Sequence, residues 1–161
     1  NIFELHILEN EKKFLEITKK RNNKFLKGFN KISYHLSDCQ MTTYNGQFCT
    51  EYKKLPLVSP DFIYLDGPDQ FKIKKRVNNF TTSHEDMMPM VCDILKFENF
   101  LIPGTIIIAD GRKANASFLL NNFKRNWLYF YDESNDQNVF YLNDKSLGII
   151  NNEILKFYKI K

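Results

Sequence analysis

Two short, almost wholly apolar runs, each followed by Asp-Gly, constrain the fold more than any other feature of this sequence. Phe62 to Leu65 precedes Asp66-Gly67, and Thr105 to Ala109 precedes Asp110-Gly111. Apolar runs of this length without polar alternation are typical of strands buried on both faces, as in a parallel sheet covered by helices. The sequence therefore predicts two such strands, with all their apolar side chains in the core and an aspartate at each end.

The segment before the first run alternates between strand and helix patterns. Residues 2–8 are mostly apolar and predict a strand, and the spacing of apolar residues over 11–27 predicts an amphipathic helix. A second strand is expected over 32–36. An Asn-Gly pair favours a turn within 42–52, either in a hairpin or in an irregular excursion.

The same alternation continues to the end of the sequence. It calls for a mostly parallel sheet with helices on both faces. The predicted fold class is therefore α/β: one doubly wound, mostly parallel sheet in a single domain over residues 1–161, with a terminal antiparallel hairpin. Beyond residue 66 the expected elements are a short helix within 71–83, helices over 85–100, 115–122 and 149–158, and paired strands over 127–131 and 139–142.

Composition and charge limit the class of protein. The 161 residues suffice for one domain with one core. The longest apolar run, 101–109, is strand-sized and far shorter than the ~20 residues of a membrane span. With no secretory signal and three cysteines in no close pairing, we expect a cytoplasmic protein with free thiols. The net charge of +4 and the one basic run, 72–76, do not favour nucleic acid as a partner.

The order and spacing of these elements resemble the class I S-adenosylmethionine-dependent methyltransferases. Two segments carry most of the resemblance: 62–69, similar to the family's fourth strand with its acidic tip, and 101–111, similar to its fifth strand after a Leu-Ile-Pro-Gly turn. The closing antiparallel pair is also typical of that family. The resemblance covers nearly the whole chain, from Ile2 to about Leu142. It implies S-adenosylmethionine as the cofactor and a small-molecule methyl acceptor.

The resemblance also implies which residues contact the cofactor. Glu9 stands where the family places an acidic residue for the ribose, and a carboxylate at a strand tip can accept hydrogen bonds from both ribose hydroxyls. Asp38 would lie near the adenine amino group, and Asp66 would complete the contacts. Two simpler alternatives stay open: Glu9 can begin the following helix, where its charge complements the dipole, and Asp38 can be a cap or turn residue.

One part of the family pattern is missing from this sequence. No GxGxG loop occurs, and no segment matches the family's first strand. That strand would lie between residues 2–8 and 62–65, whose backbone edges would otherwise stay unpaired at a cost of about 1–3 kcal/mol for each orphaned group. We therefore expect either a piece of a longer chain or a relative that no longer binds the cofactor.

Three aspartates are candidates for the chemistry. Asp66 and Asp110 would end neighbouring strands, so their carboxylates should converge at the carboxyl edge of the sheet, with Asp69 nearby. They could act as a general base or hold Mg²⁺ or Mn²⁺. The pair resembles the metal site of catechol-type O-methyltransferases, but those enzymes carry Asp-Asn where this chain has Asp110-Gly111. The alternative is plain turn chemistry, which also selects Asp and Gly.

Three further residues are candidates around the same cleft. His84, just before the helix expected from residue 85, is a second candidate base. Arg112 and Asn115 follow the fifth strand and could hold the substrate together with Asp69, Arg112 through its bidentate fork. The alternative is that Arg112 and Asn115 cap and solvate the next helix, and that His84 is a capping or surface residue.

These residues predict S-adenosylmethionine-dependent methyl transfer to a small-molecule or sugar-type acceptor, at oxygen. Two other classes stay open. One is a non-catalytic binding or assembly module that lacks the cofactor loop, and the other is a metal-dependent hydrolase that uses Asp66, Asp69 and Asp110. Methylation of nucleic acid has only the basic run 72–76 and the positive net charge in its favour.

Overall fold

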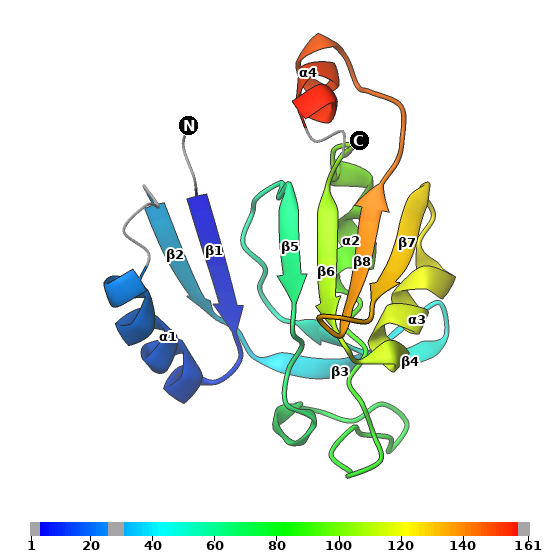
Figure 1. Ribbon diagram of the computed structural model, residues 1–161. Coiled ribbons are helices and arrows are strands. Elements are labelled where there is room, and N and C mark those ends of the chain that lie inside the picture. The colour runs from blue at the N-terminus through cyan, green and yellow to red at the C-terminus, as the bar shows by residue number, and fades with distance from the viewer. Residues whose placement is uncertain (1–3, 26–30, 158–161) are drawn as a thin grey trace. The chain divides into compact units, whose positions relative to one another are not determined.

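The computed structural model describes residues 4–25 and 31–157, which divide into two compact units (Figure 1). Among these residues, no helix has both the length and the apolar character needed to cross a bilayer. Unit 1 comprises Asn1–Leu57 and Pro68–Pro89, and unit 2 comprises Val58–Gly67 and Met90–Lys161.

Unit 1 begins with a parallel strand pair and one helix. β1 (Glu4–Glu9) pairs with β2 (Lys31–Leu36), and α1 (Lys12–Phe25) lies between them in the chain. Leu15 of α1 is buried, as the predicted amphipathic spacing requires. The predicted end of this helix, within 26–30, lies outside the described residues.

An antiparallel hairpin completes unit 1, and its turn sets its geometry. β3 (Cys39–Tyr44) and β4 (Gln47–Tyr52) are joined by Asn45 and Gly46, with φ angles of 49° and 77°. A two-residue turn of this kind needs positive φ at both positions, which Asn and Gly adopt at low cost. A 3₁₀ helix, η1 (Gln70–Lys72), follows later in the unit. The core of the hairpin consists of Cys39, Met41 and Ile73, with Phe48, Tyr52, Val77 and Phe80 packed against them.

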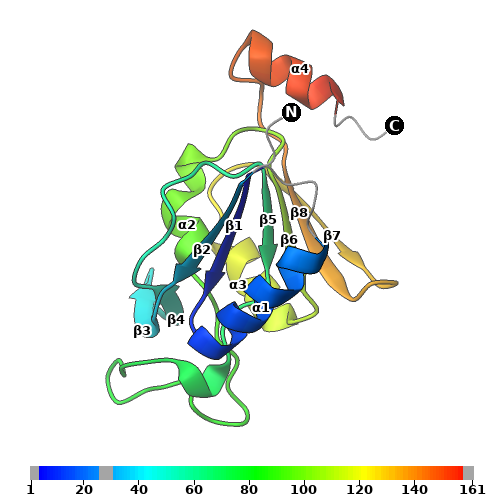
Figure 2. The same cartoon turned by 90° about the vertical axis from the view of Figure 1, so that its left-hand side faces the viewer.

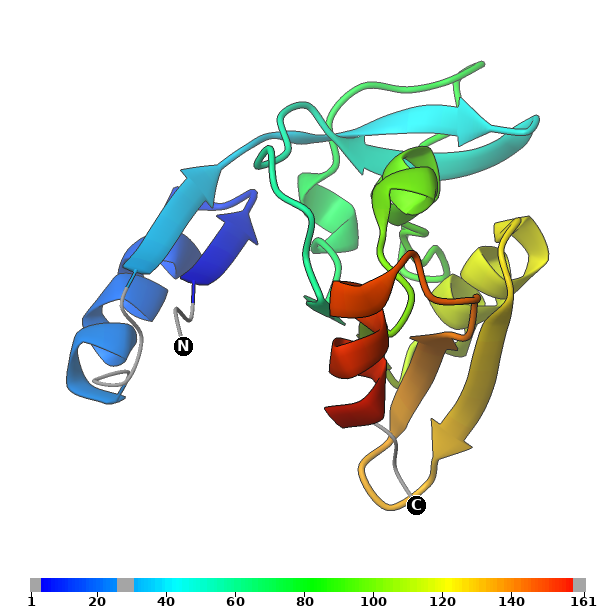
Figure 3. The ribbon, with the colours of Figure 1, turned by 90° about the horizontal axis from the view of Figure 1, so that it is seen from above.

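Unit 2 is built on a four-stranded sheet. Its described elements are β5 (Phe62–Leu65), α2 (Asp93–Phe97), η2 (Glu98–Phe100), β6 (Ile106–Asp110), α3 (Lys113–Asn122), β7 (Trp127–Asp132), β8 (Gln137–Leu142) and α4 (Ile149–Phe157). The strand order is β5-β6-β8-β7, with β5 and β6 parallel and β8 antiparallel to both its neighbours. α2 and α3 lie on one side of this sheet (Figures 2 and 3), whereas α4 lies beyond the strand ends.

The face of the sheet toward α2 and α3 forms the core of unit 2. Ile107 and Phe140 have no exposed surface there. Phe123, directly after α3, stacks on Trp127 with ring centroids 4.6 Å apart and meets Phe140 edge-on at 5.6 Å. Burial of these apolar side chains is the main contribution to the stability of the unit.

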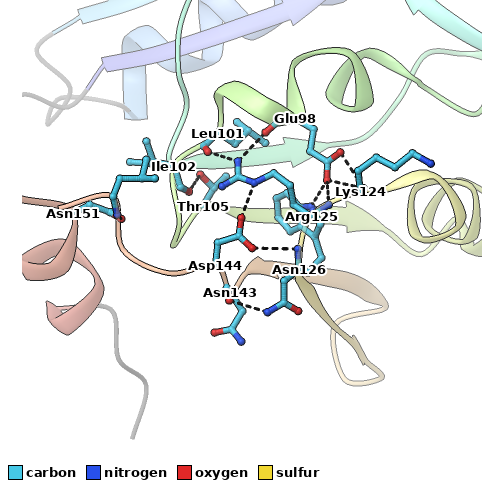
Figure 4. A network of polar contacts seen from close by, with 12 residues as sticks. Glu98, Leu101, Ile102, Thr105, Lys124, Arg125, Asn126, Asn143, Asp144 and Asn151 are labelled. Carbon is cyan, nitrogen blue, oxygen red and sulfur yellow. Dashed lines mark hydrogen bonds and ion pairs between the residues drawn. The ribbon is translucent and has the colours of Figure 1, made fainter.

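A buried polar network fixes the corner between α3 and β7 (Figure 4). The Glu98 carboxylate is buried, and it accepts hydrogen bonds from the backbone N–H groups of Lys124 and Arg125 at 2.9 to 3.1 Å. It also accepts one from the indole N–H of Trp127 at 2.9 Å. The Arg125 guanidinium donates to the Asp144 carboxylate at 2.7 Å and to the backbone carbonyl oxygens of Glu98, which begins η2, and Leu101, which follows it. Because a buried carboxylate is tolerated only when its lone pairs are filled, these contacts must form together.

The prediction of one doubly wound, mostly parallel sheet is wrong. The described strands form three separate sheets of two, two and four strands. In the four-stranded sheet only one of the three strand pairs is parallel. The order of strands along a chain does not specify which of them share hydrogen bonds, and here β3 pairs with β4 in a sheet of its own.

Several individual elements are confirmed, but one predicted helix is not. Strands lie at both apolar runs, the Asn-Gly pair forms a hairpin turn, and β7 and β8 pair antiparallel. The helix expected over 85–100 is wrong, because only α2 and the short η2 are helical there. Pro89 explains this difference: it has no N–H to donate, and it disfavours helical angles at the residue before it.

Replacing Glu98 by Gln is expected to lower the free energy of unfolding of unit 2 by about 2 kcal/mol, because an amide group would face three N–H donors and Arg125 would lose a nearby negative charge. Trp127 is the only tryptophan, so its fluorescence during urea unfolding measures the change. The control is Glu153→Gln, which removes an exposed carboxylate paired with Lys156 and should cost less than about 0.5 kcal/mol. Equal losses in the two variants would contradict the role given to the network.

Candidate functional site

The aspartates predicted at the strand ends lie together in unit 2, with an arginine between them. Asp66 directly follows β5, and Asp110 ends β6. The Arg112 guanidinium donates from Nε to Asp110 at 2.7 Å and from Nη2 to Asp66 at 3.0 Å. Asp66, Asp110 and Arg112 form what we name the strand-tip cluster.

Close packing explains the glycines that follow the two aspartates. Gly67 has a φ of +79°, and a Cβ at this position would lie 3.2 Å from the Arg112 guanidinium. A Cβ on Gly111 would overlap the carboxylate of Asp136. A residue with a side chain would therefore be strained or displaced at either position. These two positions agree with the turn-chemistry alternative for the Asp-Gly pairs.

The two carboxylates of the strand-tip cluster differ in environment. The side chain of Asp66 is 77% exposed, whereas those of Asp110 and Arg112 are 24% and 20% exposed. Burial raises the pKa of Asp110 above its ordinary value, the Arg112 guanidinium opposes this rise, and the Asp66 carboxyl adds to it. Asp110 therefore holds Arg112 in place, and Asp66 is the accessible acceptor.

The strand-tip cluster does not fit a divalent metal ion. Among the described residues, no group of three or more His, Cys, Asp or Glu side chains is arranged to hold one. The Arg112 guanidinium already bonds both carboxylates, so Mg²⁺ or Mn²⁺ at Asp66 and Asp110 would have to displace it.

Glu9, the residue predicted to bind the cofactor ribose, makes local contacts. Its carboxylate accepts hydrogen bonds from the backbone N–H groups of Asn10 at 2.7 Å and of Glu11 at 3.0 Å. These groups lie at the start of α1, where a negative charge also complements the helix dipole. This geometry agrees with the alternative in which Glu9 begins the helix.

Asp38, the residue predicted near the adenine, is paired with two lysines. Its carboxylate lies 2.5 Å from the Lys74 amine and 2.9 Å from the Lys53 amine, and their hydrogen bonds hold the pKa of Asp38 below its ordinary value. A cavity of about 240 Å³ lies beside Asp38. Ligand pockets commonly have volumes of about 300–1,000 Å³, so this cavity is small for a ligand. Its lining residues are Leu36, Ser37, Asp38, Lys53 and Lys54.

The remaining candidates make contacts within their own units. His84 and Asp69 belong to unit 1, where each accepts a hydrogen bond from a backbone N–H two residues further along, at 3.2 Å and 2.7 Å. Asn115 belongs to unit 2 but is buried, and its Oδ1 accepts a hydrogen bond from the Val91 N–H at 3.1 Å. Its Nδ2 is buried without a hydrogen-bond partner. In this position Asn115 connects α3 to the segment before α2.

A second feature of unit 2 is the sheet face that points away from α2 and α3, which we name the open face. The strand register places its side chains in rows that run across the four strands. All eight side chains in two neighbouring rows are aliphatic or aromatic. The first row contains Phe62, Ile106, Tyr141 and Leu128, and the second contains Tyr64, Ile108, Val139 and Phe130.

The outer strands of the open face are strongly exposed. Phe62 and Tyr64 on β5 are 53% and 56% exposed, and Leu128 and Phe130 on β7 are 50% and 55% exposed. At about 150–250 Å² for a large apolar side chain, these four residues expose about 400 Å², which is the size of the largest apolar patch on many monomers and is often functional. The prediction that the apolar residues of the first run all lie in the core is therefore wrong, because α2 and α3 cover only the other side of the sheet.

Carboxylates border the open face at the strand-tip cluster. The next row along the strands pairs Asp110 with Gln137 and Gln137 with Asp132, and Asp66 follows Tyr64 by two residues. Hydrogen bonds from Asn135 hold the pKa of Asp132 below its ordinary value, which favours its charged form. The hairpin turn that follows β7 adds two more acidic residues. This acidic border consists of Asp66, Asp110, Asp132, Glu133 and Asp136.

Comparisons of the chain with family models, with curated proteins and with solved structures find no match. The resemblance to class I methyltransferases is therefore wrong as an assignment. No family model supports it, and the described strands form three small sheets in place of a Rossmann-like parallel one. Binding of S-adenosylmethionine and methyl transfer to a small-molecule acceptor stay predictions from the sequence. Any assignment of function must come from the geometry of unit 1 and unit 2.

Replacing Arg112 by Met is expected to raise the pKa of Asp110 further, because the group that opposes the effect of burial is removed. A carboxyl whose pKa is raised in the folded state makes folding less favourable as the pH rises from the ordinary value of about 3.9 through the raised one. In Arg112→Met this loss of stability should extend to higher pH. Carbon NMR titration of the Asp110 carboxyl measures the shift, and Lys113→Met, whose Nζ lies over the Tyr131 ring, is the control. An unchanged titration midpoint in Arg112→Met would contradict this account.

Proposed function

We propose that this chain is a non-catalytic binding module that receives an amphipathic helix of a partner protein on the open face of unit 2. The observation that carries the proposal is the set of eight aliphatic or aromatic side chains in two adjacent rows, four of them at least half exposed. No charged side chain interrupts these rows.

The surface of the open face suits a helix as its partner. A sheet with one apolar face against water is completed by a second layer, and a helix packs at about 10 Å from a sheet. α3 already covers the opposite face of the same sheet in this way. Burying about 400 Å² at about 25 cal/mol per Å² contributes about 10 kcal/mol before the costs of association are subtracted.

The strand-tip cluster supports binding better than catalysis. A general base needs a free lone pair beside the proton that it removes. Both oxygens of Asp110 face Arg112, with contacts of 2.7 Å to Nε and 3.4 Å to the backbone N–H. A metal-dependent hydrolase needs a set of ligands that the described residues do not bring together.

Phe130→Lys is expected to weaken binding of an amphipathic helix by at least about tenfold, because it replaces a half-exposed aromatic side chain of the second apolar row by a charge that the helix would have to bury. The probe is a synthetic helical peptide with leucine on one face and glutamine on the others. Titration into the isotope-labelled whole chain, followed by amide NMR shifts, gives both the affinity and the residues affected. The control is Phe100→Lys, which replaces a 76% exposed phenylalanine of η2 outside the open face.

Shifts confined to β5, β6, β7 and β8 that disappear in Phe130→Lys and persist in Phe100→Lys would support the proposal. Two outcomes would overturn it. In one, neither the parent chain nor the control binds the peptide. In the other, sedimentation shows that the parent forms a dimer that Phe130→Lys abolishes, in which case the open face binds a second copy of the chain.

A further inference from the structure

The two long borders of the open face differ in charge. The acidic border carries five carboxylates. The cations within residues 110–113 and 132–136, which hold four of them, are Arg112 and Lys113. Arg112 is directed at Asp66 and Asp110, and Lys113 lies 4.9 Å over the Tyr131 ring. The border therefore keeps a net negative charge. Asp66, the most exposed member of the strand-tip cluster at 77%, stands two residues after Tyr64 of the second apolar row.

The opposite border carries less charge: Asp61 precedes β5 there, and Asp144 is paired with Arg125. Asn126 and Asn143, which flank β7 and β8 at that end, bond to each other through the Asn143 N–H at 2.8 Å and the Asn126 side-chain amide at 2.9 Å. A partner on the open face thus meets a cluster of carboxylates along one side and mainly neutral amides along the other.

The apolar surface is longer across the strands than along them. Four strands at about 4.8 Å spacing extend about 14 Å between the outer strand axes, while two rows are separated by about 7 Å along a strand. A helix of about three turns matches the longer dimension when it lies across the strands. In that orientation one flank of the helix runs parallel to the acidic border over its whole length.

We infer that the helix received by the open face carries lysine or arginine along one flank, and that the acidic border selects and orients it. This inference rests on the proposed docking of a helix. The apolar rows contribute most of the affinity, and the carboxylates determine which flank of the helix lies beside Asp66 and Glu133. Charged groups at the rim of an interface commonly act on specificity and association rate in this way.

The test compares three helical peptides that share one leucine face and differ in one flank, which carries lysine, glutamine or glutamate. The whole chain should bind the lysine peptide at least about tenfold more tightly than the glutamine peptide at about 20 mM salt, with most of the preference lost at about 300 mM. The double variant Asp66→Asn, Glu133→Gln should remove the preference and keep the affinity for the glutamine peptide. Asp61→Asn, which removes an exposed carboxylate at the other end of β5, is the matched control and should keep the preference.

Each outcome separates the inference from the proposal beneath it. If all three peptides bind equally and Phe130→Lys abolishes their binding, docking stands and the inference about charge is overturned. If Asp61→Asn reduces the preference as much as the double variant, the effect is one of net charge, which also overturns the inference. If none of the peptides binds, both the docking proposal and the inference fail.

Discussion

The architecture of unit 2 depends most on the contacts of Arg125. Its guanidinium bonds Asp144, which follows β8, and the carbonyl oxygens of Glu98 and Leu101, while its backbone N–H bonds the Glu98 carboxylate. These contacts join three segments that are distant in the sequence, and they fix where β7 begins. Removing the Asp144 carboxylate would leave the largely buried Arg125 guanidinium without its ion-pair partner, at a cost of about 3–5 kcal/mol. The sheet can therefore present a regular face only while this network is intact.

Strand register links the open face to the core. Ile107 is fully buried on one side of β6, and its neighbours Ile106 and Ile108 point to the other side. Because side chains alternate along a strand, a slip by one residue would move the buried set to the surface and the exposed set to the core. The packing of Ile107 against Phe140 and its neighbours thus also determines which side chains form the rows of the open face.

Much of the local structure could be predicted from the sequence, because local chemistry determines it. The apolar runs give the strands, and Asn45-Gly46 gives the hairpin turn, since these two residues tolerate positive φ. The predictions that were wrong concern features that depend on contacts between residues distant in the sequence. A run such as Ile106 to Ile108 shows that a segment is apolar, but it does not show whether one or both of its faces are covered. The bridging role of Arg112 was also not predicted, because its spacing to Asp66 reveals nothing about the direction of its guanidinium.

Arg112 explains why paired aspartates at strand ends need not form a reaction centre. Its guanidinium bonds both carboxylates, and its position fills the space in which a cation would otherwise bind. Carboxylates held in this way provide a fixed negative charge at the edge of an apolar surface. Where Asp66 is exposed to water, dissolved salt screens this charge, so its effect on affinity is largest at low ionic strength. It can still distinguish the two ends or flanks of a partner, because only one orientation brings opposite charges together.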